Sequence, residues 1–306
     1  MLPELKALKL HFLQNNNMDI RSWSAQGRFL RYRDHQVFYR DTGEINKPVL
    51  LLIHGFPSAS IDWHLCWSSL NQRFRLVALD MMGFGLSDKP KDYHYSIFDQ
   101  ANIFEHLLQQ LKIDQVHVLA HDYGDTVAQE LLSRRLEQKA QCDYQSFIFL
   151  NGGLFPETHK SVLLQRLLIS PLGKYLVRLN SYKKFKKTFD KICLGNMPEQ
   201  ELSLFWQLLN LKDGHGVMPK LINYMTERKQ HRSRWVGALQ NSDVPLRVID
   251  GIGDPISGFH MVERYRELVA NSDVVELVGI GHYPQIEAPQ QVVAAAEEFW
   301  QKINAS

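Results

Sequence analysis

The chain has 306 residues, of which 44% are hydrophobic and 22% are charged, a composition typical of a globular protein with a full core. That length suits one large domain, or one domain that carries an insertion. The formal net charge of +2 at pH 7 gives no reason to expect a nucleic-acid partner.

Short apolar segments rich in β-branched residues predict strands, and most of them alternate with longer helical patterns. The predicted strands are 35–43, 49–55, 75–80, 116–122, 146–153, 245–251 and 274–282. The spacing of apolar residues predicts helices over 96–113, 124–136 and 288–303. This alternation is typical of βα units around a mainly parallel sheet, with the first of these strands antiparallel to the rest.

The alternation of strands and helices stops in the second half of the chain. Residues 154–241 have an amphipathic helical pattern and no convincing strand. The sequence therefore predicts an α/β core, formed by residues 1–153 and 242–306, with a helical cap over 154–241 inserted into one connection of the sheet.

Three polar residues follow predicted strands at the point where each strand ends. Asp122 ends one strand, Asp254 follows the next-to-last strand, and His282 follows the last. In open parallel sheets ligands bind at the carboxyl ends of the strands, so these three side chains can converge. Their order along the chain is the order of nucleophile, acid and histidine in the α/β-hydrolase triad.

Four segments resemble motifs of the α/β-hydrolase fold, in the order that the fold requires. They are AHDYG at 120–124, HGFP at 54–57, LDMMGFGLSDKP at 79–90 and GHYPQIEAP at 281–289. In the first of them, the small residues Ala120 and Gly124 flank the sharp strand-to-helix turn that carries the nucleophile. The resemblance implies an eight-stranded, mostly parallel sheet with helices on both faces.

An aspartate on this turn narrows the resemblance to the epoxide hydrolases and haloalkane dehalogenases. The segments HDYGD, NGGLFPETH and RWVGAL look closest to the mesoderm-specific transcript protein and its bacterial relatives, which are generally described as hydrolase-like. The resemblance therefore implies an enzyme that uses Asp122 as its nucleophile, but it names no substrate.

A carboxylate suits attack on a saturated carbon better than attack on an acyl carbon. It is ionised near pH 7, because its reference pKa is about 3.9, and the helix that follows Asp122 favours the charge. With an epoxide or alkyl halide it forms a simple alkyl ester, whereas an acyl substrate would give an anhydride. His282, oriented by Asp254, would then activate a water. The resemblance implies that the backbone N–H groups of Phe56 and Tyr123 form the oxyanion hole.

Two kinds of leaving group fit this chemistry, and the residues favour an epoxide over a halide. Epoxide hydrolases protonate the leaving oxygen with tyrosines of the cap, and Tyr224 lies at the matching distance before the strand that follows the cap. Tyr175 or Tyr182 is the candidate for a second donor. A halide needs side-chain N–H groups, which Phe56 and Tyr123 do not offer.

Other roles for these residues are also open. Asp122 could instead cap a helix, and Asp254 could be a turn residue, with Glu157 as the rival for the acid role. His54 adjoins the site as a candidate for substrate contact, although structural hydrogen bonds are the favoured role for both His54 and His121. The alternative of another class is a protein that only binds a ligand on a hydrolase scaffold.

No spacing in the sequence predicts a metal or nucleotide site, so we expect no metal and no cofactor. Cys66, Cys142 and Cys193 are far apart, which favours free thiols in a reducing compartment. The first twenty residues lack the apolar core of a signal peptide, and no segment approaches the ~20 apolar residues of a membrane-spanning helix. We therefore expect a cytoplasmic protein.

The expected partners are water and a small apolar or lipophilic substrate, and not nucleic acid. The basic segment 182–191 has two interpretations. It is either a solvated helix face, which is favoured, or a surface of the cap that touches an anionic membrane.

Overall fold

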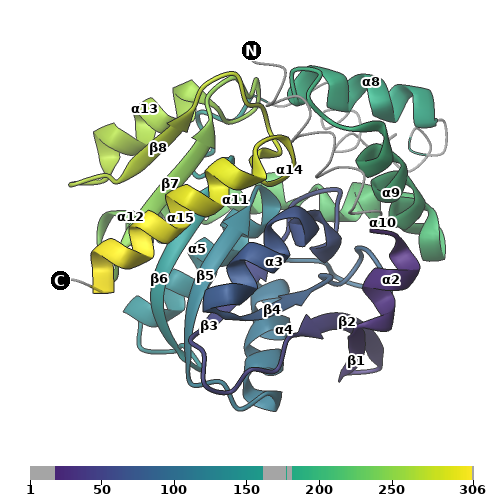
Figure 1. The fold of residues 1–306 in the computed structure, drawn as a ribbon, viewed down its shortest axis with the longest axis horizontal. Helices are drawn as coiled ribbons and strands as arrows, with labels where there is room; N and C mark the ends of the chain where they lie inside the picture. The colour runs from purple at the N-terminus through teal and green to yellow at the C-terminus, as the bar shows by residue number, and fades with distance from the viewer. Residues whose placement is uncertain (1–17, 161–176, 178–180, 305–306) are drawn as a thin grey trace.

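The computed structural model describes residues 18–160, 177 and 181–304. Its centre is an eight-stranded sheet with the strand order β1-β2-β4-β3-β5-β6-β7-β8 (Figure 1). The strands are β1 (Gly27–Tyr32), β2 (His35–Asp41), β3 (Val49–Ile53), β4 (Arg75–Leu79), β5 (Gln115–His121), β6 (Asp143–Leu150), β7 (Leu246–Gly251) and β8 (Val274–Leu277). β2 pairs antiparallel with β1 and β4, and all other neighbouring pairs are parallel. The predicted mostly parallel sheet of eight strands is confirmed.

Two strands differ from the individual predictions. β1 was not predicted, because it lies at the edge of the sheet and buries few of its side chains, so its apolar signal is weak. β8 ends at Leu277, whereas the predicted strand continued to His282. A loop therefore carries His282.

The described helices lie between and after these strands. They are α2 (Ile20–Ala25), α3 (His64–Arg73), α4 (Ile97–Gln110), α5 (Tyr123–Leu136), α8 (Tyr182–Ile192), α9 (Glu199–Asn210), α10 (Gly214–Leu221), α11 (Tyr224–Gln230), α12 (Arg232–Gln240), α13 (Phe259–Leu268), α14 (Pro284–Glu287) and α15 (Pro289–Asn304), with the short 3₁₀ helices η1 (Ser60–Trp63) and η3 (Leu211–Asp213). The three helices predicted from the spacing of apolar residues correspond to α4, α5 and α15.

The sheet is buried on both faces because alternate side chains of a strand point in opposite directions. In β3, Leu50 and Leu52 pack in one apolar cluster with α3 and α15, which lie side by side over that face (Figure 1). Leu51 and Ile53 point the other way and pack in the cluster that contains α4 and α5. The continuous apolar run of β3 therefore contributes side chains to the apolar clusters on both faces of the sheet.

The described residues between β6 and β7 form helices α8 to α12 and no strand. This part of the chain contains most of residues 154–241, and we refer to it as the insert. In α8, Phe185 and Phe189 are buried while Lys183 and Lys187 are exposed. None of the helices in the described ranges is long and apolar enough to cross a membrane. Contact of the α8 lysines with a membrane surface stays a prediction.

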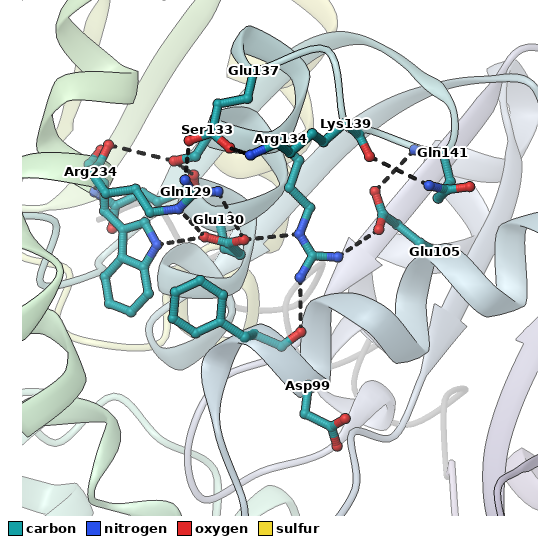
Figure 2. A network of polar contacts seen from close by, with 12 residues as sticks. Asp99, Glu105, Gln129, Glu130, Ser133, Arg134, Glu137, Lys139, Gln141 and Arg234 are labelled. Carbon is teal, nitrogen blue, oxygen red and sulfur yellow. Dashed lines mark hydrogen bonds and ion pairs between the residues drawn. The ribbon is translucent and has the colours of Figure 1, made fainter.

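Glu130, near the middle of α5, joins the insert to the core (Figure 2). Its carboxylate is buried and accepts hydrogen bonds from Arg234 Nε at 2.8 Å and Trp235 Nε1 at 2.9 Å, both on α12. It also accepts from Arg134 Nε at 2.9 Å, and Arg134 in turn pairs with Glu105 of α4 at 2.6 Å. Because a buried carboxylate needs such partners, this network fixes α12 against α5.

Replacing Glu130 with alanine should lower the free energy of unfolding by about 3 kcal/mol, because several buried donors lose their acceptor. Urea denaturation followed by circular dichroism measures the change. Glu137→Ala is the matched control, since Glu137 also pairs with Arg234 but is far more exposed. It should cost less than about 1 kcal/mol. Equal losses from both variants would contradict a special role for Glu130.

Candidate active site

Asp122 lies on the sharp turn between β5 and α5 and is only 2% exposed. Its backbone has φ 49° and ψ −105°, in a region that residues other than glycine rarely adopt. The turn needs a glycine two residues later, since a Cβ on Gly124 would lie 2.6 Å from the backbone oxygens of Ile53 and His54. This is the geometry of a nucleophile elbow, in which a strained turn exposes one side chain at the end of the sheet.

The Asp122 side chain does not cap α5, although it precedes the helix directly. Its Oδ2 instead accepts a hydrogen bond from the backbone N–H of Phe56 at 3.0 Å. The backbone N–H of Phe56, one of the two predicted oxyanion-hole donors, therefore binds the Asp122 carboxylate. The other predicted donor is the backbone N–H of Tyr123, the first residue of α5.

His282 and Asp254 lie together on the loops that follow the carboxyl ends of β8 and β7. His282 Nδ1 is 2.8 Å from Asp254 Oδ2, and both side chains are buried. The Asp254 carboxylate also accepts from the backbone N–H groups of Ile256 and Ser257, at 2.8 and 3.1 Å. Asp254 therefore shapes its own turn and orients the imidazole at the same time. Its rival Glu157 binds Arg232 on the surface.

Each residue of the His282–Asp254 pair favours the charged form of the other. Burial, the largest single effect, lowers the pKa of His282, while the charge and the hydrogen bond of Asp254 raise it. Together with smaller contributions from Asp122 and Glu287, these effects of Asp254 give His282 a raised pKa of about 9. Burial raises the pKa of Asp254, yet the adjacent imidazolium and the hydrogen bonds to Asp254 lower it overall. Near pH 7 the two residues therefore form an ion pair.

Two residues that the sequence does not predict hold the loops of Asp254 and His282 in place. Asn151, at the end of β6, accepts from Gly251 N–H at 2.8 Å and donates to Asp254 Oδ2 at 3.3 Å. Glu287 accepts from the backbone N–H groups of Gly281 and Tyr283, both at 2.9 Å, on either side of His282. Asn151 thus supports the loop that carries Asp254, and Glu287 the loop that carries His282. The only sequence signal for them is their place beside the motifs.

Both ring nitrogens of His54 bind the backbone, and contact of His54 with a substrate stays a prediction. Its Nδ1 lies 2.8 Å from Gly55 O, and its Nε2 accepts from Met81 N–H at 3.0 Å, so both ring nitrogens are occupied. Burial lowers its pKa to about 4, which keeps the ring neutral. His121 is also buried, and its Nε2 lies 2.7 Å from the carbonyl oxygen of His282.

The three candidate tyrosines lie in different surroundings. Tyr224 is 1% exposed, and its hydroxyl has no hydrogen-bond partner among the described residues. Its ring centroid is 4.7 Å from that of Tyr123, and burial together with the nearby Asp122 carboxylate raises its pKa. Tyr182 is partly exposed and donates its hydroxyl to Glu199, so its hydroxyl is already bound. Tyr175 lies outside the described residues.

A small cavity of about 10 Å³ lies between the loop that carries Phe56 and helices of the insert. It is lined by Phe56, Phe84, Leu209, Met218 and Leu221 together with their neighbours. This volume is on the scale of one water molecule, and the lining is mainly apolar. Within the described ranges, no group of three His, Cys, Asp or Glu side chains is arranged to hold a metal ion.

Fold and site together define an α/β-hydrolase. The chain belongs to the alpha/beta hydrolase fold family, whose sequence profile matches residues 48–289. It is 40% identical to the human mesoderm-specific transcript homolog protein over 295 residues, which cover 92% of this chain and 87% of that protein. It is 37% identical to LipZ of Mycobacterium tuberculosis, a protein named as a hydrolase, over 90% of this chain and 96% of LipZ.

Solved structures agree with this fold. A loop variant of the haloalkane dehalogenase DbeA from Bradyrhizobium elkanii matches with a TM-score of 0.78. The match covers 91% of this chain and 97% of that one at 20% identity, so it shows the fold alone. The predicted fold and the resemblance to the mesoderm-specific transcript proteins are confirmed, and the names of the relatives support a hydrolase.

The stability of the protein should depend on pH through His282. Because its pKa is raised from 6.5 to about 9, its contribution is full below pH 6.5 and is lost as the pH rises through about 9. The difference in unfolding free energy between wild type and His282→Gln should therefore shrink by roughly 1–3 kcal/mol over that range. Urea titrations at several pH values measure it, and a constant difference would contradict the ion pair.

Proposed function

We propose that this chain is an epoxide hydrolase that works through an alkyl ester on Asp122. The buried Tyr224 hydroxyl carries the proposal, because it has no hydrogen-bond partner among the described residues and because burial and, after it, the Asp122 carboxylate raise its pKa. Buried hydroxyls are normally hydrogen-bonded. Among the described residues the hydroxyls of Tyr144 and Tyr265 are also without a partner, but Tyr224 is the one of these three whose pKa the Asp122 carboxylate raises, which suggests a group that awaits a substrate oxygen.

In the first half-reaction, a carboxylate oxygen of Asp122 attacks a ring carbon of the epoxide. The carbon–oxygen bond of the ring breaks, and the departing oxygen takes the proton of the Tyr224 hydroxyl. The products are a hydroxyalkyl ester on Asp122 and a Tyr224 phenolate. The N–H of Phe56, at 3.0 Å from Asp122 Oδ2, orients the carboxylate for this attack.

In the second half-reaction, the neutral form of His282 takes a proton from water, and the hydroxide attacks the ester carbonyl carbon of Asp122. The intermediate expels the diol oxygen, which takes the proton from His282. The new carboxylic acid returns its proton to the Tyr224 phenolate. Esterification also removes the Asp122 charge, one of the charges that raise the pKa of His282, so the imidazole becomes a more available base once the ester has formed.

A haloalkane dehalogenase is the second candidate, supported by the carboxylate nucleophile and by the shared fold. Phe56 and Tyr123 provide no side-chain N–H group for a halide, which favours the epoxide. A protein that only binds a ligand on this scaffold is the candidate of another class. Its site would bind the same apolar compounds without forming a covalent bond.

His282→Gln should trap the ester when the protein is incubated with a panel of epoxides and haloalkanes. Intact-protein mass spectrometry should show an increase equal to the epoxide mass, and peptide mapping should place it on Asp122. In the wild type, a single turnover in ¹⁸O-labelled water should leave the label in Asp122. Asp122→Asn provides the control without a nucleophile. No adduct and no turnover across the panel would favour the binding protein.

Tyr224→Phe should slow ester formation from epoxides by about 10²-fold, because the departing oxygen loses its proton donor. The rate is measured as adduct formation in the His282→Gln background. Tyr182→Phe is the matched control and should change the rate little, since Tyr182 already binds Glu199. Ester formation from an alkyl bromide should be almost insensitive to Tyr224→Phe. An equal loss with both substrate classes would argue against proton donation.

A further inference from the structure

Two consecutive charged residues of α11, Glu227 and Arg228, are buried, with 8% and 3% of their surfaces exposed. They follow Tyr224 by three and four residues, so all three lie on the same side of this short helix. Charged side chains are rarely buried without partners, because removing them from water is costly. The partners of these two show what holds Tyr224 in place.

Arg228 contacts the elbow from the insert. Its Nε donates to Thr126 Oγ1 at 2.7 Å, and its Nη2 donates to the carbonyl oxygen of Asp122 at 3.3 Å. Its Nη1 lies 3.4 Å from His159 Nδ1. Each guanidinium nitrogen thus has a partner within the protein, so Arg228 is oriented toward the nucleophile turn and not arranged as a substrate ligand.

The same guanidinium also packs on the ring of Tyr224. Its central carbon lies 4.5 Å from the ring centroid, a cation–π contact in a buried setting. Its positive charge offsets part of the effect of burial and of Asp122 on the pKa of Tyr224. Arg228 therefore touches both groups that react in the proposed ring opening, the proton donor through its ring and the nucleophile through its backbone.

Glu227 anchors the same helix to a different part of the core. Its Oε2 accepts from the backbone N–H of Ile97 at 3.1 Å, at the first residue of α4. A helix N-terminus favours a carboxylate at this position. α11 is therefore attached at two points, to α4 through Glu227 and to α5 through Arg228.

We propose that Arg228 is a positioning residue that sets the Tyr224 ring against the Asp122 turn, with Glu227 as the second anchor of α11. This inference rests on the proposed ring opening. Its distinctive consequence is that Arg228 acts mainly through Tyr224, so its removal slows the reaction far more when the Tyr224 hydroxyl is present.

A double-mutant cycle tests this dependence in the His282→Gln background, with styrene oxide as the probe and the rate of adduct formation as the readout. Arg228→Met should slow the reaction by about 10- to 100-fold when Tyr224 is present, because a displaced donor loses most of its effect. In Tyr224→Phe the same change should slow it less than about 3-fold, since residues that act as a unit are not additive. The loss should fall on the maximal rate more than on the half-saturating concentration.

Arg232→Met, on the neighbouring helix and partly exposed, is the matched control and should leave the rate unchanged. Arg228→Lys serves if Arg228→Met folds poorly, since lysine keeps the charge but not the planar fork. Equal losses from Arg228→Met with and without the Tyr224 hydroxyl would overturn the inference. If the His282→Gln parent forms no adduct with any epoxide or haloalkane, the proposed function fails instead.

Hydrogen exchange tests the anchoring without any substrate. Arg228→Met and Glu227→Gln should each raise the exchange rates of the α11 amides by about 10-fold or more, relative to Arg232→Met, because each removes one attachment. Unchanged exchange in both variants would overturn the two-point attachment, whatever reaction the site catalyses.

Discussion

The strained backbone of Asp122 is the constraint on which the rest of the site depends. A non-glycine residue in such a conformation costs on the order of 1–3 kcal/mol and persists only where its surroundings hold it. Here β5 lies between β3 and β6 in the sheet, and α5 packs so closely on β3 that only glycine fits at position 124. The fold therefore holds the carboxylate at the edge of the sheet, where the Phe56 N–H meets it.

Buried charge is the second constraint, and it explains why the site draws residues from so many segments. His282 and Asp254 neutralise each other, and Asn151 and Glu287 hold the loops that carry them. The elbow also lies beside a buried cation, Arg228, which comes from the insert. Since unpaired charges in a protein interior are costly, the core and the insert complete the electrostatics of the site together.

Buried polar contacts join the insert to the core. Glu130 binds α12 to α5, while Glu227 and Arg228 attach α11 to the first turns of α4 and α5. Two of these contacts lie on α5, the helix that follows the Asp122 turn, and in the proposed mechanism they couple the position of Tyr224 to that turn. A proton donor held in this way would need little rearrangement during the proposed ring opening.

The sequence by itself determined the order of strands β2 to β8 and of helices α4, α5 and α15, the family, and which polar residues would follow the ends of strands. These features follow from local patterns: apolar runs, helical spacing, and polar residues directly after strands. It missed β1, because an edge strand that buries few side chains has little apolar signal.

Only the tertiary structure decided the roles that depend on contacts between distant segments. It distinguished Tyr224, whose hydroxyl has no partner among the described residues, from Tyr182, whose hydroxyl binds Glu199. It showed that both ring nitrogens of His54 bind backbone groups. It also showed that Arg228 reaches the carbonyl oxygen of a residue 106 positions earlier. Spacing along the chain does not encode such contacts, because they depend on how the insert packs against the sheet.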